Sequence, residues 1–330
     1  MLNPIGSSAL SVLILAALFG ILSGYRDSAN IVATMISSRA IRPQRALLIA
    51  ALSAALGPFI FGLSVATTIG RDFISPDVAS LPVVLAALIA ALIWNTLTAW
   101  LGLPSSSMHG LIGGLFGASI VAGGWTAINP AGLGKILLSL LVSPFLGLIS
   151  GFVIMKFILF SATNATPSIN IVFKRGQLIT VILLGLAYGA NDGQKTIGVM
   201  ALGLIAAGSL SSFQIPIEIV LLGAASIALG MSIGGWRLIR TLGGRFYTVR
   251  PVHAFSEQLA STIVILGAAA IGGPVSSSQV VSTSIMGTGS AERLSKVRWH
   301  AANSIVLAWV LTLPVTAFMA AFLCWVIRSI

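Results

Sequence analysis

Two short polar passages interrupt long apolar runs, and both hold residue types that suit ion chemistry. Residues 24–30 read Gly-Tyr-Arg-Asp-Ser-Ala-Asn, and residues 189–195 read Gly-Ala-Asn-Asp-Gly-Gln-Lys. A charge inside an apolar membrane segment is costly unless it is paired or hydrated, so such residues are functional candidates. The glycines can free backbone carbonyls for ion coordination. We therefore expect a cation or proton site; the structural alternative is a salt bridge that pins two broken helices. Its candidate residues are Arg26, Asp27, Asn30, Asn191, Asp192 and Lys195.

A second pair of matching passages contains proline followed by a cluster of serines, at 102–109 and 272–279. Proline and serine clusters interrupt helices, so a new helix would begin near Ser106 and Ser276 with unpaired backbone N–H groups and partial positive charge. Such helix starts bind oxyanions. The structural alternative is close helix packing with serines bonding between helices. His109 could donate to an anion, relay a proton or bond to a neighbouring helix. The candidate oxyanion site consists of Ser105, Ser106, Ser107, His109, Ser276, Ser277, Ser278 and Gln279.

The two pairs of passages recur at nearly constant spacing, so residues 8–157 are repeated as 173–327. Each half reads as four segments: an apolar run broken by the first motif (8–38 and 176–208), a plain span (45–68 and 216–236), a double-length apolar run (81–122 and 253–289) and a final span (133–157 and 300–327). The double-length run is either two spans or a re-entrant hairpin with the serine motif at its tip, and we favour the hairpin.

The composition places these runs in a membrane. Of the 330 residues, 57% are apolar and 8% are charged, against about 25% charged residues in an ordinary soluble domain. Apolar stretches of about twenty residues are typical of membrane helices, and the sequence lacks the alternating pattern of barrel strands. The sequence therefore predicts an all-α polytopic membrane protein and excludes a soluble globular domain.

The net charge of +11 follows from the predicted topology. If each hairpin returns to its starting side, the connections rich in lysine and arginine fall on one side, which is then cytoplasmic. Nucleic-acid binding is not needed to explain the charge. We expect the chain to lie in the cell (inner) membrane with both termini on its outer side. The second half then enters the bilayer in the opposite sense to the first. This is the inverted-repeat plan of secondary transporters. The expected organisation is repeat one at 1–157, a cytoplasmic linker at 158–175 and repeat two at 176–330.

At these motifs the sequence resembles the inorganic phosphate transporter (PiT) family, and the resemblance covers nearly the whole chain. The passages that carry it include 24–40, 103–114, 189–195, 274–278 and 297–314. The resemblance implies cation-coupled phosphate uptake, hairpin serines on the anion, motif aspartates and asparagines on the coupling cations, a homodimer, and elevator-like movement. The sequence departs from the family pattern at Arg26, Met108 and Gln279. Lys195 ends a Gly-Gln-Lys motif, which resembles the form of this motif in bacterial, proton-coupled members of the family.

Electrostatics favours protons over sodium as the coupling ions. Arg26 and Lys195 would each place a fixed positive charge beside the expected cation site. At ~4 Å, two like charges repel by about 4 kcal/mol at an effective dielectric constant near 20. Phosphate is favoured over sulfate because at neutral pH it still carries protons that a nearby aspartate can accept.

We therefore predict a secondary active transporter that imports inorganic phosphate by alternating access, with a proton gradient favoured over a sodium gradient. The alternatives are a transporter of sulfate or another oxyanion, an anion channel, and an intramembrane serine hydrolase that uses Ser107, His109 and Asp27. A serine motif whose second copy lacks the histidine disfavours the hydrolase. We expect no enzymatic activity, cofactor or metal site, and we expect phosphate, the bilayer and a second copy of the chain as partners.

Overall fold

The computed structural model describes residues 6–75, 78–103 and 105–329. Pro104, the expected helix breaker of the first serine motif, and the chain ends at 1–5 and 330 lie outside the described residues. Within the described ranges, helices and their connections make up the chain apart from an isolated β-bridge between Ile74 and Ile128. The elements are α1 (Ser7–Ser37), α2 (Pro43–Phe61), α3 (Ser64–Thr67), η1 (Thr68–Asp72), α4 (Leu81–Leu101), α5 (Ser107–Gly123), η2 (Gly124–Ala127), α6 (Pro130–Ser161), α7 (Ile169–Tyr188), η3 (Gly189–Gly193), α8 (Gln194–Ala206), α9 (Ile217–Ile233), α10 (Trp236–Arg245), α11 (Pro251–Ala270), α12 (Ser277–Glu292), η4 (Leu294–Lys296) and α13 (Trp299–Ser329).

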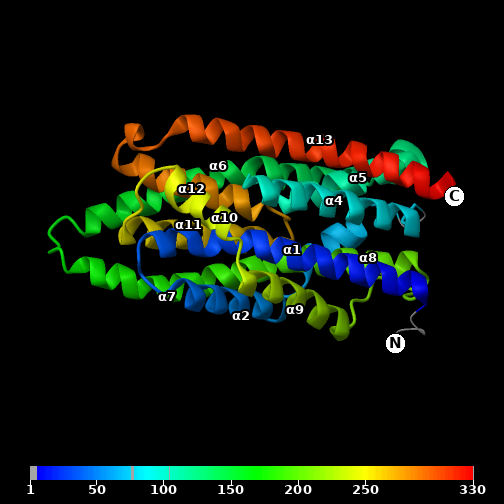
Figure 1. The fold of residues 1–330 in the computed structure, drawn as a ribbon, viewed down its shortest axis with the longest axis horizontal. Coiled ribbons are helices and arrows are strands. Elements are labelled where there is room, and N and C mark those ends of the chain that lie inside the picture. The colour runs from blue at the N-terminus through cyan, green and yellow to red at the C-terminus, as the bar shows by residue number, and fades with distance from the viewer. Residues whose placement is uncertain (1–5, 76–77, 104, 330) are drawn as a thin grey trace.

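The predicted polytopic helical fold is confirmed. Among the described residues, eight helical segments are long and apolar enough to cross a bilayer. These segments lie roughly along the long axis of the molecule (Figure 1). The expected apolar runs at 133–157 and 300–327 correspond to α6 and α13, which extend a few residues further.

The expected break in the first apolar run does not occur, because α1 is continuous from Ser7 to Ser37. Gly24 instead permits close packing between helices. A Cβ at Gly24 would lie 2.2 Å from the backbone oxygen of Ile227 in α9, and a Cβ at Gly230 would lie 1.9 Å from that of Ile21 in α1. The corresponding motif in the second half behaves differently, since residues 189–193 form a π-helical turn between α7 and α8. Such wider turns are frequent at functional sites.

Each double-length run folds as a pair of helices joined by a serine-rich tip. The pairs are α4 with α5 and α11 with α12, and the members of each pair pack against one another. Figure 1 shows that the first hairpin occupies the right half of the view and the second the left half, so their tips approach from opposite ends. This arrangement supports the inverted repeat, which stays a prediction.

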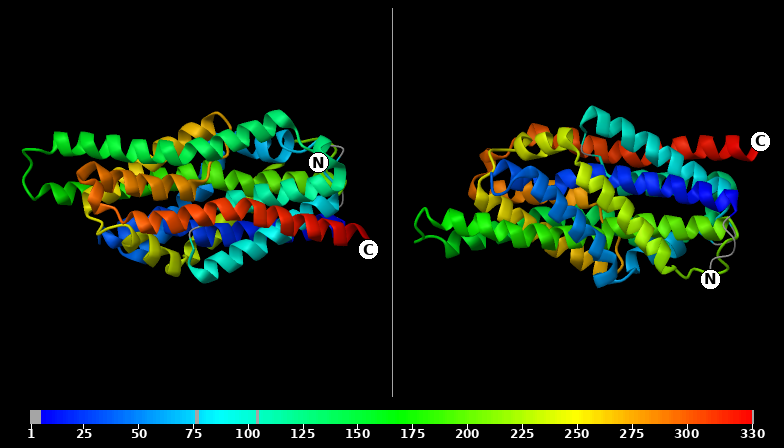
Figure 2. Two further views of the ribbon diagram at one scale, coloured as in Figure 1. Left: turned by 90° about the horizontal axis from the view of Figure 1, so that it is seen from above. Right: turned by 60° about the horizontal axis from the view of Figure 1, so that its bottom comes forward.

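The connections rich in basic residues gather at one end of the bundle, called here the basic end (left in Figure 1). They include the connections 38–42, 246–250 and 293–298; the connection 162–168 at the same end has no basic residue of its own, but Lys156 of α6 and Lys174 and Arg175 of α7 flank it. Helices α6 and α7 project beyond the rest of this end, as Figure 2 shows, and their last and first turns occupy much of the expected linker at 158–175. The first described helix begins and the last one ends at the opposite end of the bundle (Figure 1).

One helix was not expected from the sequence. After α9 the chain bends by 69° and continues as α10, a segment that the sequence suggested was a charged connection. Its apolar residues Leu238, Ile239 and Leu242 are buried, whereas Arg237 and Arg240 are exposed. Because apolar residues spaced by three and four cover one helical face, α10 lies with that face against α1.

The close approach of α1 and α9 gives a stability prediction. Gly230→Ala should destabilise the protein by about 1–3 kcal/mol, because the added methyl group meets the backbone of α1 and cannot be accommodated without a shift. The measurement is the thermal unfolding midpoint in detergent. Gly267→Ala in α11 is the control, since nothing lies within 4 Å of its Cβ position. Equal midpoints for the two variants would contradict the packing.

Candidate functional site

The serine-rich tips of the two hairpins touch. Ser276 Oγ donates a hydrogen bond of 2.8 Å to Ser106 Oγ. Each of these serines is also the N-cap of its helix: Ser106 Oγ accepts the backbone N–H of His109 at 3.1 Å, and Ser276 Oγ accepts that of Gln279 at 3.4 Å. Serine is favoured at this position because its side chain satisfies an otherwise unpaired N–H. The starts of α5 and α12 therefore meet at these two serines, which are both buried.

A buried lysine connects the polar motifs of both halves with both tips. The Lys195 side chain is fully buried, and its Nζ donates to Asp192 Oδ1 at 2.6 Å, to Asp27 Oδ2 at 3.5 Å and to Ser107 Oγ at 2.5 Å. Asp192 accepts a further hydrogen bond from Ser277, and Asp27 accepts one of 3.3 Å from Ser107. One ammonium group is thus shared between two carboxylates that lie in different halves of the sequence.

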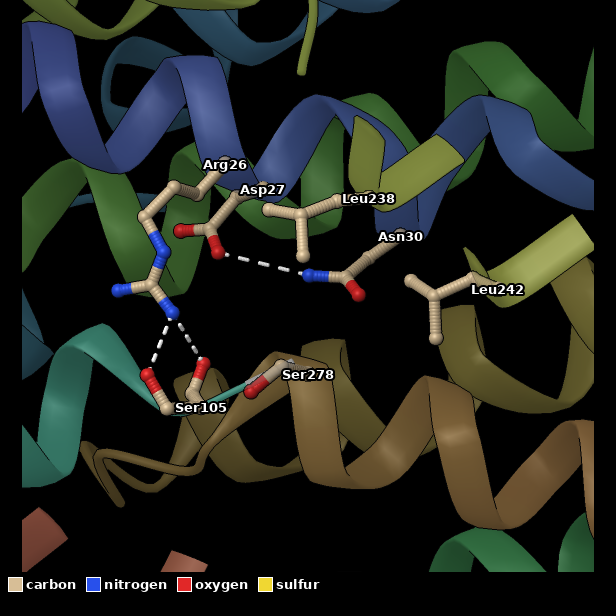
Figure 3. Close-up of a pocket in the computed structure, with 7 residues that line it drawn as sticks. All are labelled: Arg26, Asp27, Asn30, Ser105, Leu238, Leu242 and Ser278. Atoms are coloured by element: carbon tan, nitrogen blue, oxygen red, sulfur yellow. Dashed lines mark hydrogen bonds between the residues drawn. The ribbon is translucent and has the colours of Figure 1, made fainter. Parts of the chain in front are cut away.

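Arg26 holds the tip of the first hairpin. Its guanidinium donates to the side chain of Asn95 in α4, and to the backbone oxygen and Oγ of Ser105 at 2.7 and 2.6 Å. Figure 3 shows Arg26 reaching from α1 toward Ser105, with Asp27 beside it. Among the described residues, Arg26 Nε has no hydrogen-bond partner. Arg26 therefore fixes a helix tip, and it does not pair directly with the neighbouring aspartate.

The two motif asparagines have different environments. Asn30 Nδ2 donates to Asp27 Oδ1 at 3.4 Å. Asn191 Nδ2 donates to the backbone oxygen of Gly273 at 3.3 Å, so it contacts the tip of the second hairpin. The buried Oδ1 of Asn191 has no partner in the described part of the chain, which leaves it available to a ligand.

His109 and Gln279 do not join this cluster. Both line a different cavity, which lies between α6 and α13. His109 Nδ1 and Gln279 Oε1 are buried without a partner among the described residues. The sequence placed both residues in the oxyanion shell; in the structure neither lines the cavity that Arg26 and Asp27 line. Ser278 does line the central cavity and lies 3.2 Å from Ser276 between their Oγ atoms.

The cavity beside Arg26 is small. It has a volume of about 10 Å³, which is about the space of one water molecule. Its wall includes Leu238 and Leu242 of α10; Figure 3 shows Leu238 between Asp27 and Asn30, and Leu242 on the far side of Asn30 from Arg26. Sequence reasoning missed these residues because the four arginines of 237–250 suggested a loop; the apolar spacing of 238, 239 and 242 was the signal that could have identified the helix.

A further buried carboxylate lies near the cluster. Glu257 of α11 accepts hydrogen bonds from Thr34 at 2.8 Å and Ser261 at 3.1 Å. In the structure its hydrogen-bond partners are these two hydroxyls, of which Thr34 belongs to α1.

The charges of the centre balance. Arg26 and Lys195 are set against Asp27 and Asp192, and all four side chains are buried. Hydroxyl groups and helix starts are donors without net charge, which suits reversible anion binding. Among the described residues, no group of three histidines, cysteines or acidic residues could hold a metal ion. The arrangement is thus suited to holding an oxyanion at the tips and protons on the aspartates.

The chain is similar to known phosphate transporters over nearly its whole length. It matches the model of the phosphate transporter family over residues 23–320. It is 36% identical to a "Probable low-affinity inorganic phosphate transporter" of Bacillus subtilis, with 97% of each chain covered, and 37% identical to a protein of the same name from Rhizobium meliloti, with 94% and 93% covered. A solved structure named "The sodium-dependent phosphate transporter" has a TM-score of 0.90 at 26% identity and covers 98% of this chain and 100% of that chain.

The shared ammonium group predicts a charge-balance effect. Lys195→Met should destabilise the protein by about 3–5 kcal/mol, because it leaves buried carboxylates without their cation. Adding Asp192→Asn restores the balance, so the double variant should recover part of that loss. The measurement is a double-mutant cycle on thermal stability in detergent. A double variant whose loss equals or exceeds the sum of the two single losses would show that Lys195 and Asp192 are not coupled in this way.

Proposed function

Because the chain belongs to the phosphate transporter family, we propose that it imports inorganic phosphate by alternating access and that protons, not sodium ions, drive the import. The family assignment makes it a membrane transporter and not an enzyme. The observation that carries the coupling proposal is the position of Lys195, whose Nζ lies between Asp27 and Asp192 and beside the serine tips.

The proposed anion site is the junction of the two tips. Ser106 and Ser276 bond to one another across it, and the adjacent space of about 10 Å³ is too small for a tetrahedral oxyanion. The tips must therefore separate to admit phosphate, whose oxygens then accept the hydroxyl and N–H donors that the two tips present. This exchange of one hydrogen-bond partner for another keeps the helix starts satisfied in both states.

The support for proton coupling is that the ammonium of Lys195 already occupies the space between Asp27 and Asp192. A sodium ion that bound there would face the ammonium of Lys195 within about 4 Å, at a cost of about 4 kcal/mol. A proton adds to a carboxylate oxygen and needs no coordination shell. The solved structure named sodium-dependent gives the alternative of sodium coupling for this fold, so the two ions have to be compared directly.

Phosphate is preferred over sulfate as cargo for a related reason. Dihydrogen phosphate and hydrogen phosphate donate hydrogen bonds, and Asp27 and Asp192 can accept them, whereas sulfate only accepts. Sulfate or another oxyanion remains the alternative substrate class. An anion channel is a remoter alternative, because the space of about 10 Å³ beside the tips is too small for an oxyanion.

The proposed topology assigns the basic end to the cytoplasm. Both chain ends then lie outside, and the two hairpins open toward opposite sides of the cell membrane. Such inverted hairpins permit a site near the middle of the bilayer to be exposed alternately. We also propose that the transporter is a homodimer.

The coupling ion can be identified by uptake into proteoliposomes. We expect an inward proton gradient without sodium to drive phosphate accumulation, and an inward sodium gradient at constant pH to drive little, because Lys195 excludes the metal cation. Radiolabelled phosphate uptake measures both, with sulfate and arsenate as competitors. Accumulation driven by sodium and indifferent to pH would refute proton coupling, and flux that ignores both gradients would indicate a channel.

The roles of the carboxylate and the hydroxyl groups can be separated by substitution. Asp192→Asn should lower proton-driven uptake by tenfold or more, on the scale of about 1.4 kcal/mol per factor of ten, because it removes a charge and a proton acceptor. Ser276→Ala should weaken uptake less, since neighbouring serines still donate. Ser282→Ala, buried further along α12, is the control and should transport normally. If Asp192→Asn and Ser276→Ala lowered proton-driven uptake equally, this would contradict the proposal that Asp192 has a special role in coupling.

A further inference from the structure

An apolar groove runs along the outer face of the bundle between α6 and α13. Its larger part is a cavity of about 550 Å³. Its walls are highly exposed, with Leu141, Phe145 and Val310 between 64% and 67% exposed. Its lining residues in α6 and α13 lie within segments that are long and apolar enough to cross a bilayer, so a groove at this place would open toward lipid.

The groove continues to the basic end. A second cavity of about 230 Å³ shares Leu148 with the first and extends past Phe152 to Leu294 and Trp299. Helix α12 forms the floor along the whole length, from Gln279 in the first cavity to Ser290 in the second. At 1.5 Å per residue the floor is about 16 Å long. The two cavities are therefore parts of one groove, which begins near the hairpin tips and ends at the basic end.

Cationic side chains surround the open end of this groove. Arg293 and Arg298 are exposed, and each directly precedes a residue that lines the groove, Leu294 or Trp299. Trp299 Nε1 donates to the backbone oxygen of Leu294 at 3.0 Å, which joins the two sides. Tryptophan is enriched at the membrane interface, so this end of the groove lies at headgroup depth.

The nearby acidic residue does not neutralise these arginines. Burial alone raises the pKa of Glu292, but hydrogen bonds from Lys296 and His253 outweigh it and bring the value to about 2. Glu292 is thus ionised and bonded to Arg250 and Lys296. In the part of the chain that the structure describes, the side chains of Arg293 and Arg298 have no hydrogen-bond or ion-pair partner.

We propose that this groove binds an anionic phospholipid, with one acyl chain along α12 and the phosphate group at Arg293 and Arg298. The apolar length and the cationic end match the two parts of such a lipid. A second copy of the chain fits less well. In a dimer with a twofold axis normal to the bilayer, Arg293 and Arg298 of the second copy would lie at the same depth as Arg293 and Arg298 of the first. The like charges of the two copies would then repel one another.

The test uses the contribution of Trp309, which lines the groove, to the fluorescence of the seven tryptophans of the chain; this contribution is the difference between the chain and its Trp309→Phe variant. The protein is reconstituted into vesicles of phosphatidylglycerol and phosphatidylcholine of constant composition, in which either the first or the second lipid carries brominated acyl chains. Bromine quenches tryptophan on contact, so the comparison reports which lipid occupies the groove. We expect brominated phosphatidylglycerol to quench more, and Trp309→Phe to remove most of the excess.

Charge variants decide whether the mouth of the groove selects the lipid. Because cationic side chains at the membrane surface attract anionic lipids, Arg293→Gln with Arg298→Gln should lower the preference by at least fivefold. Lys174→Gln with Arg175→Gln is the matched control, because these exposed residues lie on α7, and it should keep the preference. Equal quenching by both lipids, or an unchanged preference in the arginine variant, would overturn the proposal. So would the absence of quenching at Trp309 by either lipid, which would indicate that a second copy covers the groove.

Discussion

The buried ammonium group of Lys195 is the interaction on which the centre of this protein depends. A cation or a carboxylate alone in the middle of a helical bundle is strongly disfavoured, and pairing recovers that cost only when the remaining donors and acceptors are also satisfied. Lys195 meets this condition by donating to Asp192, Asp27 and Ser107. Because these partners come from η3, α1 and the start of α5, one side chain fixes the relative positions of the two repeated motifs and a hairpin tip.

Close helix packing places those partners within reach. Helices α1 and α9 approach through Gly24 and Gly230, and η3 lies against α2, where a Cβ at Gly189 would be 2.0 Å from the backbone oxygen of Ala54. The glycines of the polar motifs thus act mainly by permitting contact between backbones. The π-helical turn at 189–193 is the local consequence in the second half, while α1 accommodates its motif as an uninterrupted helix.

The centre of the site could be predicted from the sequence, and its surroundings could not. Duplicated motifs indicated that Ser106 and Ser276 would meet, because helix starts at equivalent places in two hairpins are brought together by the symmetry of the repeat. The sequence also identified Asp27, Asp192 and Lys195 as buried charges. It did not show which charges would pair: Arg26 next to Asp27 bonds to Ser105 and Asn95 instead. It also could not show that His109 and Gln279 line the cavity between α6 and α13, since the rotation of α5 and α12 about their axes is set by packing on α6 and α13.

The ion pair of the centre and the hydroxyl groups that contact it belong to different parts of the fold. Lys195 and Asp192 are three residues apart on the same stretch of helix, so their ion pair moves as a unit. The contacts of this pair with the hairpin tips are made to Ser107 and Ser277. Breaking them exposes hydroxyl groups, which water or an oxyanion can satisfy at small net cost, and leaves the ion pair intact. Arg26 differs, because its guanidinium bonds to Asn95 and Ser105 of the first hairpin. Movement of the first tip away from α1 would break these charged contacts, whereas the second tip is held by the hydroxyl of Ser277 and the amide of Asn191, so separation of the second tip from the centre costs less.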